Sequence, residues 1–164
     1  MVATNPAPDL ALVPLTGHSR SLRELLTTFH LLFVAVDPAS VRSRWIVPTA
    51  SRVLFEYEQA DCRVAWLVAG DAADARKLLG RWATDIMTFV DPELTAIKGF
   101  GIETLPAIVH VGMDLTIVNS VEGWEPMAWR ELTTELSRRM SWSRPHIPVP
   151  GDPGAFEGSP LPRV

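Results

Sequence analysis

The run HLLFVAV at residues 30–36 most constrains the fold of this chain. After its first residue it is uninterrupted in apolar side chains, several of them branched or aromatic. Such a run is typical of a strand that is covered on both faces. Because helices provide that covering in α/β proteins, the run predicts an α/β fold with residues 30–36 as the central strand.

The flanking segments alternate between helix-like and strand-like patterns. Residues 38–59 carry apolar side chains at spacings of about three, four and seven, which predicts a helix kinked at Pro48. Its expected apolar face consists of Trp45, Ile46, Val53, Leu54 and Tyr57. Further strands are expected at 10–14 (an edge strand), 64–69, 86–90, 107–111 and 115–121. Further helices are expected at 21–29, 71–82, 91–99 and 125–140, with Asp71 and Asp91 as N-caps.

This order of elements predicts a mixed central sheet flanked by helices. Strands separated by helices pair in parallel through right-handed crossovers, whereas the two strands at 107–121 form an antiparallel hairpin. The chain of 164 residues is long enough to bury an apolar core as one domain.

Residues 145–164 contain six of the 14 prolines and three of the ten glycines. Proline interrupts helices and strand ladders, so we expect a domain at 1–144 followed by a solvated Pro/Gly-rich tail at 145–164. The alternative is that Phe156 and Leu161 dock on a partner.

The charge and hydropathy patterns exclude several functional classes. A formal net charge of -4 gives no general attraction to nucleic acid or anionic membrane. No apolar run reaches the roughly 18 residues of a membrane helix, and residues 1–10 lack the features of a secretory signal. We therefore expect a cytoplasmic protein that binds neither nucleic acid nor membrane.

Cys62 is the only cysteine, so one chain can form neither an internal disulfide nor a cysteine-based zinc site. The four histidines share no metal-ligand spacing: His18, His30, His110 and His146. We expect no metal and no cofactor, and we assign no catalytic role to His110.

Two segments resemble a known family. The entry segment from Ala7-Pro8-Asp9 to Leu22, and GIETLPAIVHV at 101–111 followed by Gly123, are similar to the TlpA and AhpC/TSA (peroxiredoxin-like) branch of the thioredoxin-like superfamily. The resemblance covers residues 7–140 and implies a thioredoxin fold. The helix and strand at 71–90 match the extra unit of TlpA-like proteins.

The resemblance also locates the position of the reactive motif. The family carries Cys-x-x-Cys where the central strand meets the long helix, with a proline five residues beyond the second cysteine. Counting back from Pro48 places Ser40 and Ser43 at the cysteine positions, and a competing register places Pro38 and Val41 there. Neither register contains a thiol, so disulfide exchange is not expected at this position.

Two further catalytic features of the family are absent. The buried acid of thioredoxins corresponds to Val34, and residues 37–43 lack the threonine that precedes a peroxidatic cysteine. Cys62 is expected at the opposite end of the long helix, where we favour an ordinary buried residue. The enzyme alternative is a thiol-disulfide oxidoreductase or peroxidase that uses Cys62.

The resemblance implies that Pro106 is cis and that the backbone of Leu105 can align an extended polypeptide, as in strand addition. We assign a peptide-binding groove to Leu105, Pro106, Arg42 and Trp124. Alternatively, Arg42 is solvated and Trp124 belongs to the core. With Ser40, Ser43 and Arg44, Arg42 could instead bind an anion at the helix N-terminus.

These expectations combine into one functional hypothesis. The protein is a redox-inactive thioredoxin-fold protein that binds a protein or peptide client as a chaperone or assembly factor. The segment from Gly101 to Leu136 is similar to hydrogenase-maturation chaperones that have thioredoxin folds without Cys-x-x-Cys.

Overall fold

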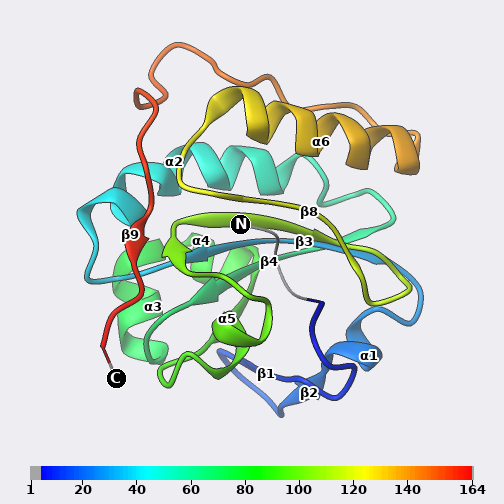
Figure 1. Ribbon diagram of the computed structural model, residues 1–164, viewed down its shortest axis with the longest axis vertical. Coiled ribbons are helices and arrows are strands. Elements are labelled where there is room, and N and C mark those ends of the chain that lie inside the picture. Colours follow the sequence, from blue (N-terminus) through cyan, green and yellow to red (C-terminus); the bar gives the residue numbers. More distant parts are fainter. Residues whose placement is uncertain (1–4, 164) are drawn as a thin grey trace.

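The computed structural model describes residues 5–163, and its main sheet has seven strands in the order β2-β1-β5-β4-β3-β7-β8 (Figure 1). The strands of this sheet are β1 (Ala11–Pro14), β2 (Arg20–Ser21), β3 (His30–Val36), β4 (Cys62–Val68), β5 (Met87–Val90), β7 (Ala107–Val111) and β8 (Ile117–Glu122). A second sheet pairs β6 (Thr104–Leu105) with β9 (Ser159–Pro160). The helices are α1 (Leu22–Leu25), α2 (Val41–Phe55), α3 (Ala72–Leu79), α4 (Trp82–Asp85), α5 (Thr95–Gly99) and α6 (Pro126–Met140).

The central strand β3 has the bounds that the sequence predicts, and its last six residues are buried. It pairs in parallel with β4 and antiparallel with β7, while β4 pairs in parallel with β5 and β7 pairs antiparallel with β8. The prediction of an α/β protein with a mixed central sheet is confirmed.

Two helical layers enclose this sheet (Figure 1). On one face α2 and α6 pack onto the sheet through a cluster that includes Ile46, Leu54, Trp129 and Leu136. On the other face α1 and α5 contribute Leu22, Leu25, Ile97 and Phe100 to a second cluster. The burial of β3 on both faces explains its continuous apolar sequence.

Three sequence predictions differ from the structure in detail. The helix expected at 71–82 divides into α3 and α4, because Gly80 has a φ of +56° and ends the first helix. Asp71 caps α3 as predicted.

Asp91 does not begin a helix, but its carboxylate accepts hydrogen bonds from the backbone N–H groups of Ala96 (3.2 Å) and Ile97 (2.8 Å) in α5. Strand β1 is not the edge, because β2 pairs outside it.

Trp45 was predicted on the buried face of α2, but its side chain is 54% exposed. The other four residues of that predicted face are buried. At 100° per residue, Trp45 points roughly 120° away from their common direction. The Trp45 side chain therefore lies outside the buried face of α2, on the side where the C-terminal segment passes.

The prediction of a solvated tail is wrong. After α6 the chain returns past α2, pairs with β6 through β9 and ends near α3, as the orange and red trace in Figure 1 shows for its path past α2 and α3. The Asp152 carboxylate accepts hydrogen bonds from Arg52 Nη1 (2.7 Å), Arg52 Nη2 (2.9 Å) and Thr49 Oγ1 (2.8 Å) of α2. Composition alone did not reveal this, because a two-residue edge ladder tolerates proline and a single buried carboxylate can hold an irregular segment.

Candidate functional site

The start of α2 carries the two serines at the predicted motif positions. Ser40 is the N-cap residue, and its Oγ accepts a long hydrogen bond of 3.4 Å from the backbone N–H of Ser43. Ser43 is buried, and its Oγ accepts a hydrogen bond of 2.9 Å from the backbone N–H of Asp37. Both hydroxyls therefore stabilise the turn between β3 and α2, and neither supplies a thiolate for sulfur chemistry.

The cis-proline segment lies at the same end of the sheet. The Leu105–Pro106 peptide bond is cis, and both residues are buried. The carbonyl oxygen of Pro106 accepts a hydrogen bond of 2.7 Å from the backbone N–H of Gly123. Since Ala107 pairs with Ala35, near the end of β3, the proline segment adjoins the turn that leads into α2.

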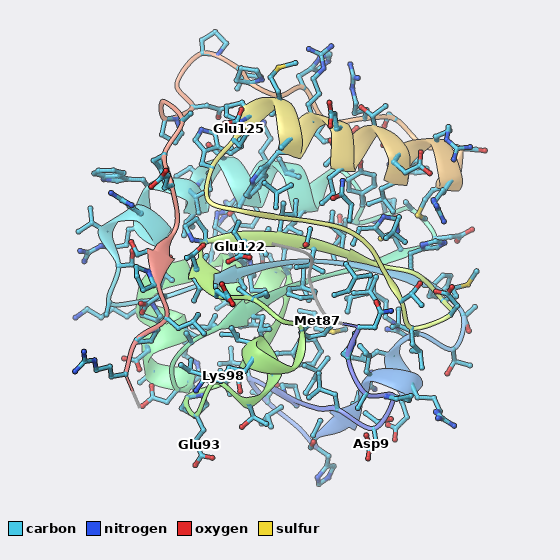
Figure 2. The ribbon with its side chains drawn as sticks, viewed as in Figure 1. Asp9, Met87, Glu93, Lys98, Glu122 and Glu125 are labelled. Atoms are coloured by element: carbon cyan, nitrogen blue, oxygen red, sulfur yellow. The ribbon has the colours of Figure 1, made fainter. Side chains whose placement is uncertain are left out.

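Glu122, labelled in Figure 2, holds the segment before the cis-proline. Its Oε1 accepts hydrogen bonds from the backbone N–H groups of Glu103 (3.0 Å) and Thr104 (2.6 Å) and from Thr104 Oγ1 (2.9 Å). One carboxylate oxygen at the end of β8 thus orients β6. Glu122 was not predicted from the sequence, because a single glutamate at a strand end carries no recognisable pattern.

The C-terminal segment occupies the edge of β6. Thr104 pairs with Pro160, and Leu105 pairs with Ser159, in an antiparallel ladder. The N–H of Leu161 also donates to the carbonyl oxygen of Glu103 at 3.3 Å. An extended polypeptide therefore lies on the backbone of Leu105, where strand addition was expected, and it belongs to the same chain.

Arg42 and Trp124 contact the same segment. Arg42 Nη1 donates to the carbonyl oxygen of Glu157 at 2.8 Å, and Trp124 Nε1 donates to that of Pro153 at 2.7 Å. The backbone of Trp124 exchanges two hydrogen bonds with Phe156, of 2.8 and 3.0 Å. The indole ring of Trp124 is itself buried and packs edge-to-face on Trp129, with ring centroids 5.0 Å apart.

The structure thus gathers three of the four predicted groove residues around residues 153–161. Gly123 and Trp45 complete this surface and were not predicted for it. A Cβ atom on Gly123 would lie 2.8 Å from the nitrogen of Gly158, and Trp45 lies edge-to-face with Phe156 at 5.9 Å between ring centroids. The sequence offered one indication that Gly123 belongs to this surface: it directly precedes Trp124, within the region of the family resemblance.

Cys62 lies far from this surface. It is the first residue of β4 and pairs with His30 at the start of β3, whereas α2 follows the end of β3. Six strand steps separate these ends, which is roughly 20 Å. Cys62 is 7% exposed, and burial raises the pKa of its thiol to about 12. The thiol is therefore neutral at physiological pH.

Beside Cys62, two imidazoles form a hydrogen-bonded pair at the same end of the sheet. His30 Nδ1 lies 2.9 Å from His110 Nε2, and His110 is fully buried. Burial is the main cause that lowers the pKa of His110, to about 4, and the neighbouring His30 lowers it further. Within residues 5–163, no group of three or more His, Cys, Asp or Glu side chains is placed to hold a metal ion.

Comparison with known proteins gives the fold. The chain matches no protein-family model and no curated protein. Solved structures that share its fold include the thioredoxin domain of a thiol-disulfide oxidoreductase from Bacteroides vulgatus (14% identity, 85% of this chain and 99% of that one, TM-score 0.64). A secreted disulfide oxidoreductase of Mycobacterium tuberculosis, homologous to E. coli DsbE, is similar over 81% of this chain and 95% of its own (16% identity, TM-score 0.59).

Peroxidoxin BcpB from Mycobacterium tuberculosis is also similar, over 74% of this chain and 85% of its own, with 14% identity and a TM-score of 0.59. The chain therefore has the thioredoxin fold, as its resemblance to the TlpA and AhpC/TSA branch implied. It carries that fold without a Cys-x-x-Cys motif. None of the helices within the described part of the chain is long and apolar enough to cross a membrane.

Proposed function

We propose that this protein binds an extended segment of another polypeptide by strand addition to β6 and acts as a chaperone or assembly factor. The observation that carries the proposal is the antiparallel ladder between β6 and residues 159–160. This ladder supports the proposal, because residues 159–160 of the same chain pair with the edge of β6 as an extended strand. Backbone hydrogen bonds of this kind give affinity without requiring one particular client sequence.

The groove that we propose consists of Leu105, Pro106, Arg42 and Trp124. Leu105 supplies the strand edge, Arg42 donates to a carbonyl oxygen, and Trp124 offers both its backbone and its indole N–H. All of these contacts address the backbone of the bound segment. They would align a client in the way that they align residues 153–161.

We propose further that no thiol exchange accompanies this binding at Ser40 and Ser43. A serine hydroxyl is barely ionised at neutral pH and forms no stable equivalent of a disulfide. The hydrogen bond from Asp37 to Ser43 also commits one of these hydroxyls to the turn. The position keeps the helix N-terminus of a redox site and lacks its nucleophile.

The oxidoreductase or peroxidase alternative requires Cys62 to react. No observation favours it, because the thiol is buried, neutral and at the far end of the sheet from the groove. An insulin-reduction and peroxide-consumption assay separates the two ideas. Activity at the level of the buffer blank is expected, and turnover that disappears in Cys62→Ser would support the alternative.

Photo-cross-linking in the cells that make the protein tests the binding proposal. A photoreactive phenylalanine analogue is placed at Val41, which is exposed beside the groove, and at Asp9, which lies on the far side of the molecule in Figure 2. We expect a cross-link to a second polypeptide from position 41 and none from position 9. The absence of any cross-linked polypeptide at position 41 would count against a binding role.

The cytoplasmic location stays a prediction, and one structurally similar protein is secreted. The proposed binding mode uses hydrogen bonds from the edge of β6, from Arg42 and from Trp124 to the backbone of the client. It therefore calls for no metal, cofactor, nucleic acid or membrane.

A further inference from the structure

The segment already seated on β6 shows which side chains the groove accepts. Residues 156–160 run along the start of α2 and the edge of β6, and each position meets a different surface. The positions fall into three kinds: one that contacts an aromatic ring, one that admits only glycine, and one that faces solvent. Together they define a pattern that another polypeptide would have to match.

The first position takes an aromatic ring. The backbone of Phe156 is fixed by its two hydrogen bonds to Trp124, and its ring packs against Trp45 at an interplanar angle of 71°. Trp45 is otherwise one of the most exposed large apolar side chains of the described chain. Edge-to-face pairs of this kind add stabilisation beyond the area that they bury.

The third position takes glycine. A Cβ atom on Gly158 would lie 2.5 Å from Thr104 Oγ1 and 2.8 Å from Thr104 Cβ. These distances are shorter than any tolerated contact, and Thr104 cannot retreat because its Oγ1 and backbone N–H both donate to Glu122. Any side chain at this position would push the segment off β6.

The second position, occupied by Glu157, does not select a particular side chain. Glu157 contacts Arg42 through its backbone carbonyl oxygen only, and its own side chain is exposed. Ser159 and Pro160 then pair with β6 through the ladder. The resulting pattern is aromatic, any residue, glycine, followed by an extended pair.

We propose that the groove selects unstructured polypeptide segments with an aromatic residue two positions before a glycine. Residues 156–160 are the chain's own copy of that pattern, which a client must displace. This inference rests on the proposed function and names its client class. A segment tethered within the same chain competes at an effective concentration in the millimolar range, so it lowers the apparent affinity for every client.

One substitution separates the groove from its resident segment. In the full chain, Gly158→Ala places a methyl group against Thr104 and should release residues 156–160, leaving every residue of β6 and α2 unchanged. Gly154→Ala is the matched control, since a Cβ at Gly154 meets nothing within 4 Å. Both variants are checked for native folding by circular dichroism. Release of the segment is measured by amide hydrogen exchange at Trp124, Phe156 and Leu161, whose N–H groups join the segment to the rest of the chain.

The probe is a fluorescein-labelled peptide, PGAFEGSPL, that copies residues 153–161, and binding is measured by fluorescence anisotropy. We expect the Gly158→Ala protein to bind it at least about tenfold more tightly than the wild type, and the Gly154→Ala protein to behave as the wild type. The same peptide carrying Gly158→Ala should bind at least about tenfold more weakly to the opened groove, and the peptide carrying Phe156→Ala about three- to fivefold more weakly.

The outcomes distinguish this inference from the proposed function. If the opened groove binds a scrambled peptide as tightly as the copy, the client pattern is wrong but strand addition stands. If hydrogen exchange shows that the segment is released and no peptide binds, the proposed function fails as well. A wild-type dimer that dissociates in Gly158→Ala would identify the occupant as the segment of a second copy and overturn the proposal.

A second protein variant covers the case in which Gly158→Ala fails to fold. Phe156→Ala removes only the ring contact with Trp45 and should raise the affinity for the labelled peptide by a smaller factor of about three to five, because the backbone ladder remains. Unchanged affinity in Phe156→Ala would show that the aromatic position contributes nothing and would contradict the pattern.

Discussion

The two ends of β3 differ in a way that separates binding from reactivity. At one end, where β3 leads into α2, the side chains are serines, and the backbone of β6 accepts an extended segment. At the other end lie the only thiol and a pair of imidazoles, Cys62, His30 and His110, which are buried or half-buried. Disulfide exchange requires a thiolate, and the first end carries no cysteine.

This difference shows that a thioredoxin fold can place a helix N-terminus beside a cis-proline and a strand edge without a thiol at that end. The helix N-terminus, the cis-proline segment and the strand edge are products of backbone packing, which the apolar core maintains. A reactive thiol depends on one residue type at one position. The core and the reactive position can therefore vary independently, and fold alone does not specify activity.

Introducing thiols where β3 leads into α2 should produce the largest change. In a Cys62→Ser background, Ser40→Cys with Ser43→Cys places two thiols at the spacing of a redox motif, with the N-terminus of α2 to stabilise a thiolate. We expect insulin reduction to rise from the buffer blank to measurable turnover. Ser40→Cys alone is the control, because it cannot close an internal disulfide. A folded double variant with no turnover would show that the groove itself prevents the reaction.

The native thiol at the other end should be nearly inert. A pKa raised from 9.0 to about 12 lowers the thiolate fraction by roughly a thousandfold near neutral pH, and burial limits access further. Labelling of the folded protein with a disulfide reagent should therefore be at least that much slower than labelling in denaturant. Rapid labelling of the folded state would restore Cys62 as a candidate reactive residue.

The imidazole pair should make stability depend on pH. Because the pKa of His110 is about 4 in the folded state and near 6.5 when unfolded, the unfolded chain binds a proton first as the pH falls. The free energy of unfolding should therefore decrease from about pH 6.5 to about pH 4, by up to roughly 3 kcal/mol. Above about pH 6.5 the His110 side chain is neutral in both the folded and the unfolded chain, so it adds no pH dependence to the free energy of unfolding.

Denaturant unfolding across this pH range measures the effect. His110→Leu should flatten the profile, and His18→Leu is the control because His18 is exposed. His30, Arg139 and Glu135 are the other charged or titratable groups that act on His110. An unchanged profile in His110→Leu would assign the pH dependence to other groups.

The smallest predicted effect concerns the ion pair between Arg52 of α2 and Asp152, which holds the C-terminal segment against that helix. Asp152→Ala removes a carboxylate that is 4% exposed from Arg52 and Thr49, so we expect a loss of about 1–2 kcal/mol after allowing for the partly exposed arginine. Asp85→Ala is the control, since its pair with Arg81 is long, at 3.9 Å, and exposed. Equal effects of the two variants would show that Asp152 does not hold the segment.

Much of the fold could be predicted from local patterns. The bounds of β3 and β7, the N-cap at Asp71 and the helix at 126–140 follow from apolar runs, capping residues and proline placement. Helix boundaries with weaker sequence signals were predicted wrongly. The helix predicted at 71–82, for example, is interrupted at Gly80. The candidate motif positions came from counting along the chain, which needs no tertiary information.

The path of residues 145–163 could not be predicted in this way. Their composition argues for solvation, and the contacts that hold them join positions about a hundred residues apart, such as Arg52 with Asp152. Glu122 and Gly158 gain their roles only because β6 passes between them. No local pattern records a contact of that kind.

The sequence by itself determined the α/β class, the central strand and the absence of a thiol pair, because these depend on residue type and on spacing within one segment. The tertiary structure alone decided that His30 and His110 meet as a hydrogen-bonded pair, and that the chain's own C-terminal segment pairs with β6. Both facts depend on which distant segments meet when the core is buried, and the free energy of that packing is shared among many residues rather than recorded in any one stretch of the chain.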